Sequence, residues 1–140
     1  MDLRISHCFV VVQDMDQALT FYRDALELEV RNDVTFENMR WLTLGSPRQP
    51  DVQVVLELTS NHPRISADDQ RALEDLLAKG LLKGLIFVTD SCDETFGKIR
   101  ASGAEVLQEP VDQPYGVRDC AFRDPSGNMV RFSQEIPRRP

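Results

Sequence analysis

The order of predicted secondary structure repeats along the chain, and this repeat constrains the fold more than any other feature of the sequence. Alternating or continuous short apolar runs predict strands, and apolar residues recurring every three or four positions predict helices. In each half, one strand is followed by a helix and then by three more strands. In the first half we expect strands over 3–12, 27–34, 38–44 and 52–58, and a helix that begins at Asp14 or Asp16 and ends at residue 26. In the second half we expect strands over 82–89, 104–111, 117–123 and 129–136, and a helix that begins at Asp90, Ser91 or Asp93 and ends at residue 101. A duplicated βαβββ order predicts an α+β fold of two similar modules.

Short local similarities give the repeat a register. Residues 12–14 align with 88–90, and residues 54–58 align with 128–132. In this register Glu57 stands opposite Arg131, and His7 stands opposite Lys83, or opposite Gly84 if the first alignment slips by one residue. These positions are therefore expected to be structurally equivalent in the two modules.

A chain of 140 residues is sufficient for one domain with its own core. We expect a first module over about 3–60, a linker helix over about 65–80, and a second module over about 82–136. Within the linker, residues 66–79 carry a leucine stripe and acidic residues in the first turn, which is typical of a helix. The tail 137–140 is expected to fray.

Composition narrows the functional classes. A formal net charge of -7 argues against a nucleic-acid partner. No segment reaches eighteen apolar residues, so no membrane span is expected. The three cysteines, Cys8, Cys92 and Cys120, are widely spaced and odd in number, which predicts neither a disulfide framework nor a zinc site. A reducing cytoplasm is the expected compartment.

Arg131 is the most unusual residue of the last predicted strand. A turn over 124–128, with Pro, Gly and Asn suited to it, leads directly into alternating residues. Alternation puts Arg131 on one face with Met129 and Ser133. A long cation in mid-strand either faces solvent or needs a partner, because burying it unpaired costs several kcal/mol.

Two motifs resemble a known superfamily. Residues 14–22, Asp-Met-Asp-Gln-Ala-Leu-Thr-Phe-Tyr, are similar to its first-helix pattern, and Tyr115-Gly116 followed by residues 122–128 resembles its C-terminal signature. The superfamily is that of the vicinal oxygen chelate proteins, which includes glyoxalase I, extradiol dioxygenases and bleomycin-resistance proteins. The resemblance covers nearly the whole chain and implies two curved half-barrel modules around a cavity.

In the enzymes of that superfamily, the first and last strands of each module carry metal ligands. Carried over to this sequence, those positions are His7, Glu57, Lys83 (or Gly84) and Arg131, of which only His7 and Glu57 can bind a metal. Lysine and arginine are hydrogen-bond donors only and repel a divalent cation. We therefore predict no metal site, with a divalent metal as the alternative, and expect Arg131 to form a buried pair with Glu57.

The candidate site residues follow from the same comparison. His7 and Glu57 are the catalytic candidates, and the ligand-binding candidates are Arg131, Lys83, Trp41, Tyr115, Phe122 and Met39. Aromatic residues on strands suit an apolar or aromatic ligand, although most strand aromatics form ordinary core. His7 likewise has an alternative to a catalytic role, which is that of an ordinary histidine packed in the core.

Three functions remain open at this point. The first is a binding protein with a degenerate metal site that holds a small organic ligand, aromatic or, given the acidic charge, cationic. The second is a metal-dependent glyoxalase-like lyase or dioxygenase that uses His7 and Glu57. The third is a homodimeric partner protein whose cavity is a relic. A homodimer is expected in any case, because the superfamily pairs modules and exposed sheet edges favour pairing.

Overall fold

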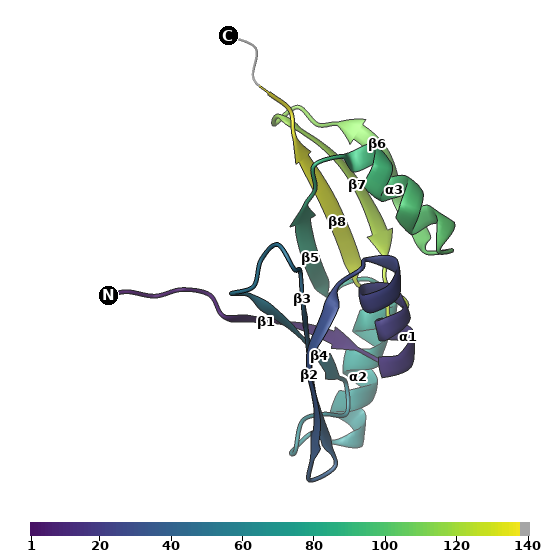
Figure 1. The fold of residues 1–140 in the computed structure, drawn as a ribbon. Coiled ribbons are helices and arrows are strands. Elements are labelled where there is room, and N and C mark those ends of the chain that lie inside the picture. The colour runs from purple at the N-terminus through teal and green to yellow at the C-terminus, as the bar shows by residue number, and fades with distance from the viewer. Residues whose placement is uncertain (138–140) are drawn as a thin grey trace. The chain divides into compact units, whose positions relative to one another are not determined.

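A computed structural model describes residues 1–137, which form parts of two compact units, 1–77 and 78 onward (Figure 1). In the first unit, strand β1 (His7–Val12) leads into helix α1 (Met15–Leu19), which continues as a π-helical segment, η1 (Thr20–Ala25). Strands β2 (Glu29–Phe36), β3 (Met39–Gly45) and β4 (Gln53–Leu58) follow. The sheet order is β1-β4-β3-β2, with β1 parallel to β4 and the other pairs antiparallel. Helix α2 (Ala67–Ala78) then leads to the second unit.

The second unit repeats this plan. Strand β5 (Lys83–Val88) is followed by helix α3 (Cys92–Ala101) and by strands β6 (Glu105–Asp112), β7 (Val117–Arg123) and β8 (Met129–Glu135). Its sheet order is β5-β8-β7-β6, again with one parallel pair, β5 and β8. The predicted tandem βαβββ modules are thus confirmed, and neither sheet closes into a barrel in the described part of the chain.

In each module only one face of the sheet packs against the helix. On this face of the first module, Val10 and Val12 of β1 and Leu56 of β4 are almost fully buried, as are Ala18 and Tyr22 of the helix. Side chains alternate between faces along a strand, so the neighbouring positions point away from the helix. Each module therefore has a second, helix-free face.

Three details of the first module differ from the sequence-based expectation. The first strand begins at His7 rather than at residue 3, and residues 3–6 are exposed. Phe9, expected in a strand buried on both faces, is 57% exposed because it lies on the helix-free face. The second strand begins at Glu29, because Glu27 has a positive φ of 59° that ends the helix and cannot continue into a strand.

The turn before β8 is held by a single carboxylate. Oδ1 of Asp124 accepts hydrogen bonds from the backbone N–H groups of Ser126, Gly127 and Asn128, each at 2.9 Å. Gly127 has φ 121°, which favours glycine. The turn sets the register of the β7–β8 hairpin, in which Arg123 pairs with Met129 and Ala121 pairs with Arg131. It thereby decides where Arg131 lies.

No helix within residues 1–137 is long and apolar enough to cross a membrane. The prediction for the tail, 137–140, falls almost entirely outside the described residues.

Candidate functional site

Arg131 forms an ion pair with Asp119 on the helix-free face of the second module. Nη1 of Arg131 lies 3.2 Å from Oδ2 of Asp119, whose side chain is only 1% exposed, whereas that of Arg131 is 22% exposed. The two residues are diagonal neighbours, since Arg131 pairs with Ala121 and Asp119 pairs with Ser133. The cation in mid-strand therefore has a buried partner in its own module.

Both oxygens of Asp119 are fully engaged. Oδ1 accepts hydrogen bonds from the side-chain amides of Gln108, at 2.8 Å, and Gln113, at 2.9 Å. Oδ2 accepts from the hydroxyl of Tyr115, at 3.3 Å, in addition to Arg131. Burial acts to raise the pKa of Asp119, but these amide hydrogen bonds and the charge of Arg131 outweigh it, so the pKa is lowered. Asp119 is held as a carboxylate.

This partner differs from the one expected from the repeat register, which was Glu57. Asp119, Gln108 and Gln113 were not among the predicted site residues. The hairpin turn could have identified Asp119, because a turn over 124–128 pairs Arg123 with Met129 and so puts Asp119 diagonally across from Arg131. Gln108 could not have been found in this way, because β6 and β7 pair with two register shifts.

The guanidinium of Arg131 has donors left over. Nη1 also donates to Oε1 of Gln108 at 3.0 Å, while the contact of Nη2 is with the thioether of Met129 at 3.7 Å, a weak acceptor. Ile86 stands opposite Arg131 on β5 and is 67% exposed. Lys83 stands opposite Met129 on the same strand and is exposed. This part of the face combines two cations with an apolar edge strand.

The helix-free face of the first module carries an exposed aromatic group. The ring of Trp41 lies 6.5 Å from that of Phe9, edge to face, and 6.0 Å from the imidazole of His7. Trp41 is 43% exposed and Phe9 57%. Val34, paired with Trp41 on β2, and Met39 are also exposed on this face. Exposed clusters of large apolar side chains commonly mark binding surfaces.

His7 and Glu57 lie apart within the first module. His7 is exposed, and its Nδ1 lies 2.8 Å from the Ser6 hydroxyl. Glu57 pairs with Val11, four residues along β1 from His7, which is about 13 Å of strand. Within residues 1–137 no group of three or more His, Cys, Asp or Glu side chains is placed to hold a metal ion. Two distant ligands do not fit the metal that the superfamily's enzymes use.

Of the other predicted ligand-binding residues, Phe122 does not reach the helix-free face. It is fully buried on the helix side of the second sheet, where its ring lies 5.3 Å from Phe96 and 6.2 Å from Phe132. Side chains alternate between the faces of β7, so Phe122 points to the helix side whereas its neighbours Ala121 and Arg123 point to the helix-free face. The ring of Tyr115 is 68% exposed, although its hydroxyl reaches Asp119.

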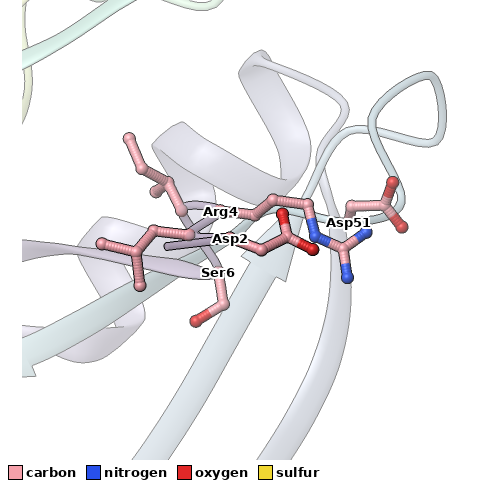
Figure 2. Close-up of a pocket in the computed structure, with 6 residues that line it drawn as sticks. Asp2, Arg4, Ser6 and Asp51 are labelled. Carbon is pink, nitrogen blue, oxygen red and sulfur yellow. The ribbon is translucent and has the colours of Figure 1, made fainter.

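Two open hollows also lie on the surface, one apart from the candidate residues and one beside Tyr115. One, of about 420 Å³, is lined by the N-terminal segment, and in it the side chains of Asp2 and Arg4 extend toward Asp51 (Figure 2). The other, of about 510 Å³, lies between the loop at Tyr115 and Gly116 and the end of the chain's last strand at Glu135. The first is formed by an exposed segment outside the sheet and offers no buried polar group to a ligand.

Known proteins resemble this chain along most of its length. A structure described as the crystal structure of UcmS2 is 34% identical with a TM-score of 0.88, covering 95% of this chain and 98% of that one. TnmS3, described as an antibiotic binding protein from Streptomyces sp. CB03234, is 25% identical with a TM-score of 0.73, covering 96% and 97%. The uncharacterized protein YurT of Bacillus subtilis (strain 168) is 28% identical over 126 residues, which are 90% of this chain and 94% of that protein.

The family model for Glyoxalase/Bleomycin resistance protein/Dioxygenase superfamily proteins matches residues 4–132. The match extends over both modules and includes the two motifs singled out in the sequence, the first helix over 14–22 and the segment that ends in the turn over 124–128. The chain belongs to the Glyoxalase/Bleomycin resistance protein/Dioxygenase superfamily.

Proposed function

We propose that this protein binds a small organic molecule with a planar aromatic part and does not turn it over. The observation that carries the proposal is the exposed group of Phe9, Trp41 and His7 on the helix-free face of the first module. Aromatic rings in edge-to-face contact present a rigid apolar surface that can stack on a planar ligand at little cost in side-chain entropy.

The chemistry of the superfamily's metal positions also supports a binding role. The second module has Lys83 and Arg131 where metal ligands are expected by resemblance, and neither side chain can donate a lone pair. Reactions that need a Lewis acid at these positions have no ligand set to hold one. Among the relatives, TnmS3 is described as an antibiotic binding protein, and we propose that this chain has a function of the same class.

We also propose that the protein is a homodimer. Strands β1 and β5 lie at the edges of their sheets, and Phe9, Ile86 and Val88 on them are more than half exposed. Edge strands with exposed apolar residues are suited to pairing with a second chain. Light scattering coupled to size-exclusion chromatography would give twice the 15.9 kDa chain mass for a dimer, and a monomer mass at tens of micromolar protein would contradict this.

The binding proposal can be tested by titrating the ¹⁵N-labelled protein with 2-naphthamide, a neutral planar probe, and following backbone amide shifts. We expect saturable shifts at Phe9 and Trp41, and a Kd raised at least fivefold by Trp41→Ala. Phe36→Ala is the matched control, because Phe36 is exposed on the neighbouring strand tip and is not in the aromatic group. Absence of saturable binding, or equal loss in the two variants, would overturn the proposal.

A further inference from the structure

We infer that the helix-free face of the second module is itself a binding site, at which Arg131 binds the anionic oxygen of an aromatic acid, so that its ligand class is carboxylates or phenolates, and not cations. The acidic net charge of the chain suggests the opposite preference, because it would attract a cation from a distance. The local arrangement of charges around Arg131 decides between the two.

The carboxylate of this cluster cannot take up a cationic ligand. Oδ1 of Asp119 already accepts from Gln108 and Gln113, and Oδ2 accepts from Tyr115 and Arg131. A carboxylate has about four acceptor positions, and these four donors fill them. The side chain is also 1% exposed, so a ligand ammonium could not reach it without displacing a neighbour.

The arginine, by contrast, can still donate hydrogen bonds to a ligand. Its side chain remains 22% exposed, and only Nη1 has oxygen acceptors, namely Asp119 and Gln108. Nη2 is in contact with the Met129 sulfur, which an oxyanion would replace as a much stronger acceptor. A guanidinium held on one side by a buried carboxylate is fixed in orientation, which reduces the entropy lost when it binds a ligand.

The surroundings of Arg131 match an aromatic acid. Ile86 stands directly opposite on β5, and Val88, one pair further along, is 80% exposed, so an apolar body can lie beside the cation. Lys83 adds a second positive charge at the near end of the strand pair. Glu135 is an exposed anion four residues from Arg131 on β8, about 13 Å away along the strand.

Three naphthalene probes of the same shape can test this inference. They are 2-naphthoate, 2-naphthamide and 2-(aminomethyl)naphthalene, which are anionic, neutral and cationic at pH 7. Affinities would be measured by amide-shift titration of the full chain, following Ile86, Ala121 and Arg131. We expect 2-naphthoate to bind at least tenfold more tightly than the amine, with the amide between them.

The variants separate a binding role from a structural one. Arg131→Gln should reduce the preference for naphthoate to less than twofold. If this variant misfolds because Asp119 is left buried without its cation, the double variant Arg131→Gln with Asp119→Asn removes both charges and should show the same loss of preference. Asp119→Asn alone keeps the cation and removes its neutralising partner, so it should strengthen naphthoate binding. Arg118→Gln is the control, because Arg118 lies on the helix side and pairs with Asp93 and Asp112.

Each outcome has a distinct meaning. Binding of all three probes with no preference for the anion, or a preference that survives Arg131→Gln, overturns the inference and leaves the proposed binding function intact. Binding of the amine in preference to naphthoate overturns the inference in the same way. Failure of 2-naphthoate to shift Ile86, Ala121 and Arg131 also overturns the inference, whereas the proposed function is decided separately by the shifts at Phe9 and Trp41.

Discussion

Arg131 and Asp119 meet diagonally across β7 and β8, with Nη1 of the arginine 3.2 Å from Oδ2 of an almost fully buried carboxylate. The pair joins two strands of one sheet, and it holds a cation at a position where the superfamily's enzymes are expected to carry a metal ligand. The predictions below test this pair, the turn that positions it, and the chemistry that it excludes.

Asp119→Ala should destabilise the protein strongly. The substitution leaves Arg131 and the amides of Gln108 and Gln113 without their shared acceptor. We expect a loss of about 2–4 kcal/mol in the free energy of unfolding, below the cost for a fully buried pair because Arg131 retains contact with water. Urea unfolding would measure it. Arg118→Ala, which removes two solvent-exposed ion pairs with Asp93 and Asp112, should cost clearly less, and equal losses would contradict the assignment.

The contribution of Asp119 to stability should depend on pH. Because its pKa in the folded state is lowered, the folded protein binds this proton less readily than the unfolded chain does. The stabilisation is therefore complete above the unfolded pKa of about 3.9 and is lost as pH falls through the folded pKa. The difference in unfolding free energy between wild type and Asp119→Asn should be larger at pH 7 than at pH 3. An unchanged difference would show that the charge of Asp119 is not responsible.

Asp124→Ala should loosen the turn before β8. Three backbone N–H groups share Oδ1 of this side chain, and the Gly127 N–H also donates to the Asp124 carbonyl at 3.1 Å. We expect a loss of about 2–3 kcal/mol in the free energy of unfolding, because the hydrogen bonds to Oδ1 are lost at a buried turn. Asp124→Asn retains the oxygen and should cost clearly less in the same unfolding assay. Equal costs would show that the hydrogen bonds to Oδ1 are not what stabilises the turn.

The cysteines should differ in reactivity toward maleimides. Cys92 and Cys120 are fully buried, and burial is the main cause that raises the pKa of Cys120 to about 12. Since the thiolate is the reactive form, neither should be modified in the native protein at pH 7. Cys8 is only partly buried and should be the site that reacts. Mass spectrometry after labelling should show at most one adduct, and three after labelling in denaturant. Native labelling of Cys120 would contradict the buried placement.

Metal chelation should leave the protein unchanged. His7 and Glu57 are two ligands about 13 Å apart along their strands, and the equivalent residues of the second module are cations. We expect EDTA to shift the Tm by less than about 1 °C, because within residues 1–137 no group of three metal-binding side chains is placed to hold a stabilising ion. Elemental analysis of protein purified without chelator is the independent check. Stoichiometric metal that disappears in His7→Ala would instead favour the lyase or dioxygenase alternative.

Much of the fold could be predicted because its signals are local. Alternating apolar residues located the strands, Asp14 and Ser91 cap their helices as expected, and the 124–128 turn was recognised from its residue types. The errors lie where one face of a strand is left open. Phe9 was expected to be core in a continuous apolar run, and Phe122 was a candidate to line a ligand pocket, because residue type does not reveal on which side of a sheet the helix packs.

The sequence by itself determined the duplicated module and the superfamily, because these depend on residue identity and order along the chain. Only the tertiary structure decided the partner of Arg131. That partner depends on the pairing of β7 with β8 and on the shifted register of β6, which bring Asp119 and Gln108 to one guanidinium. Register is a property of pairing between distant segments, and a shift of one residue would turn every one of these side chains to the opposite face.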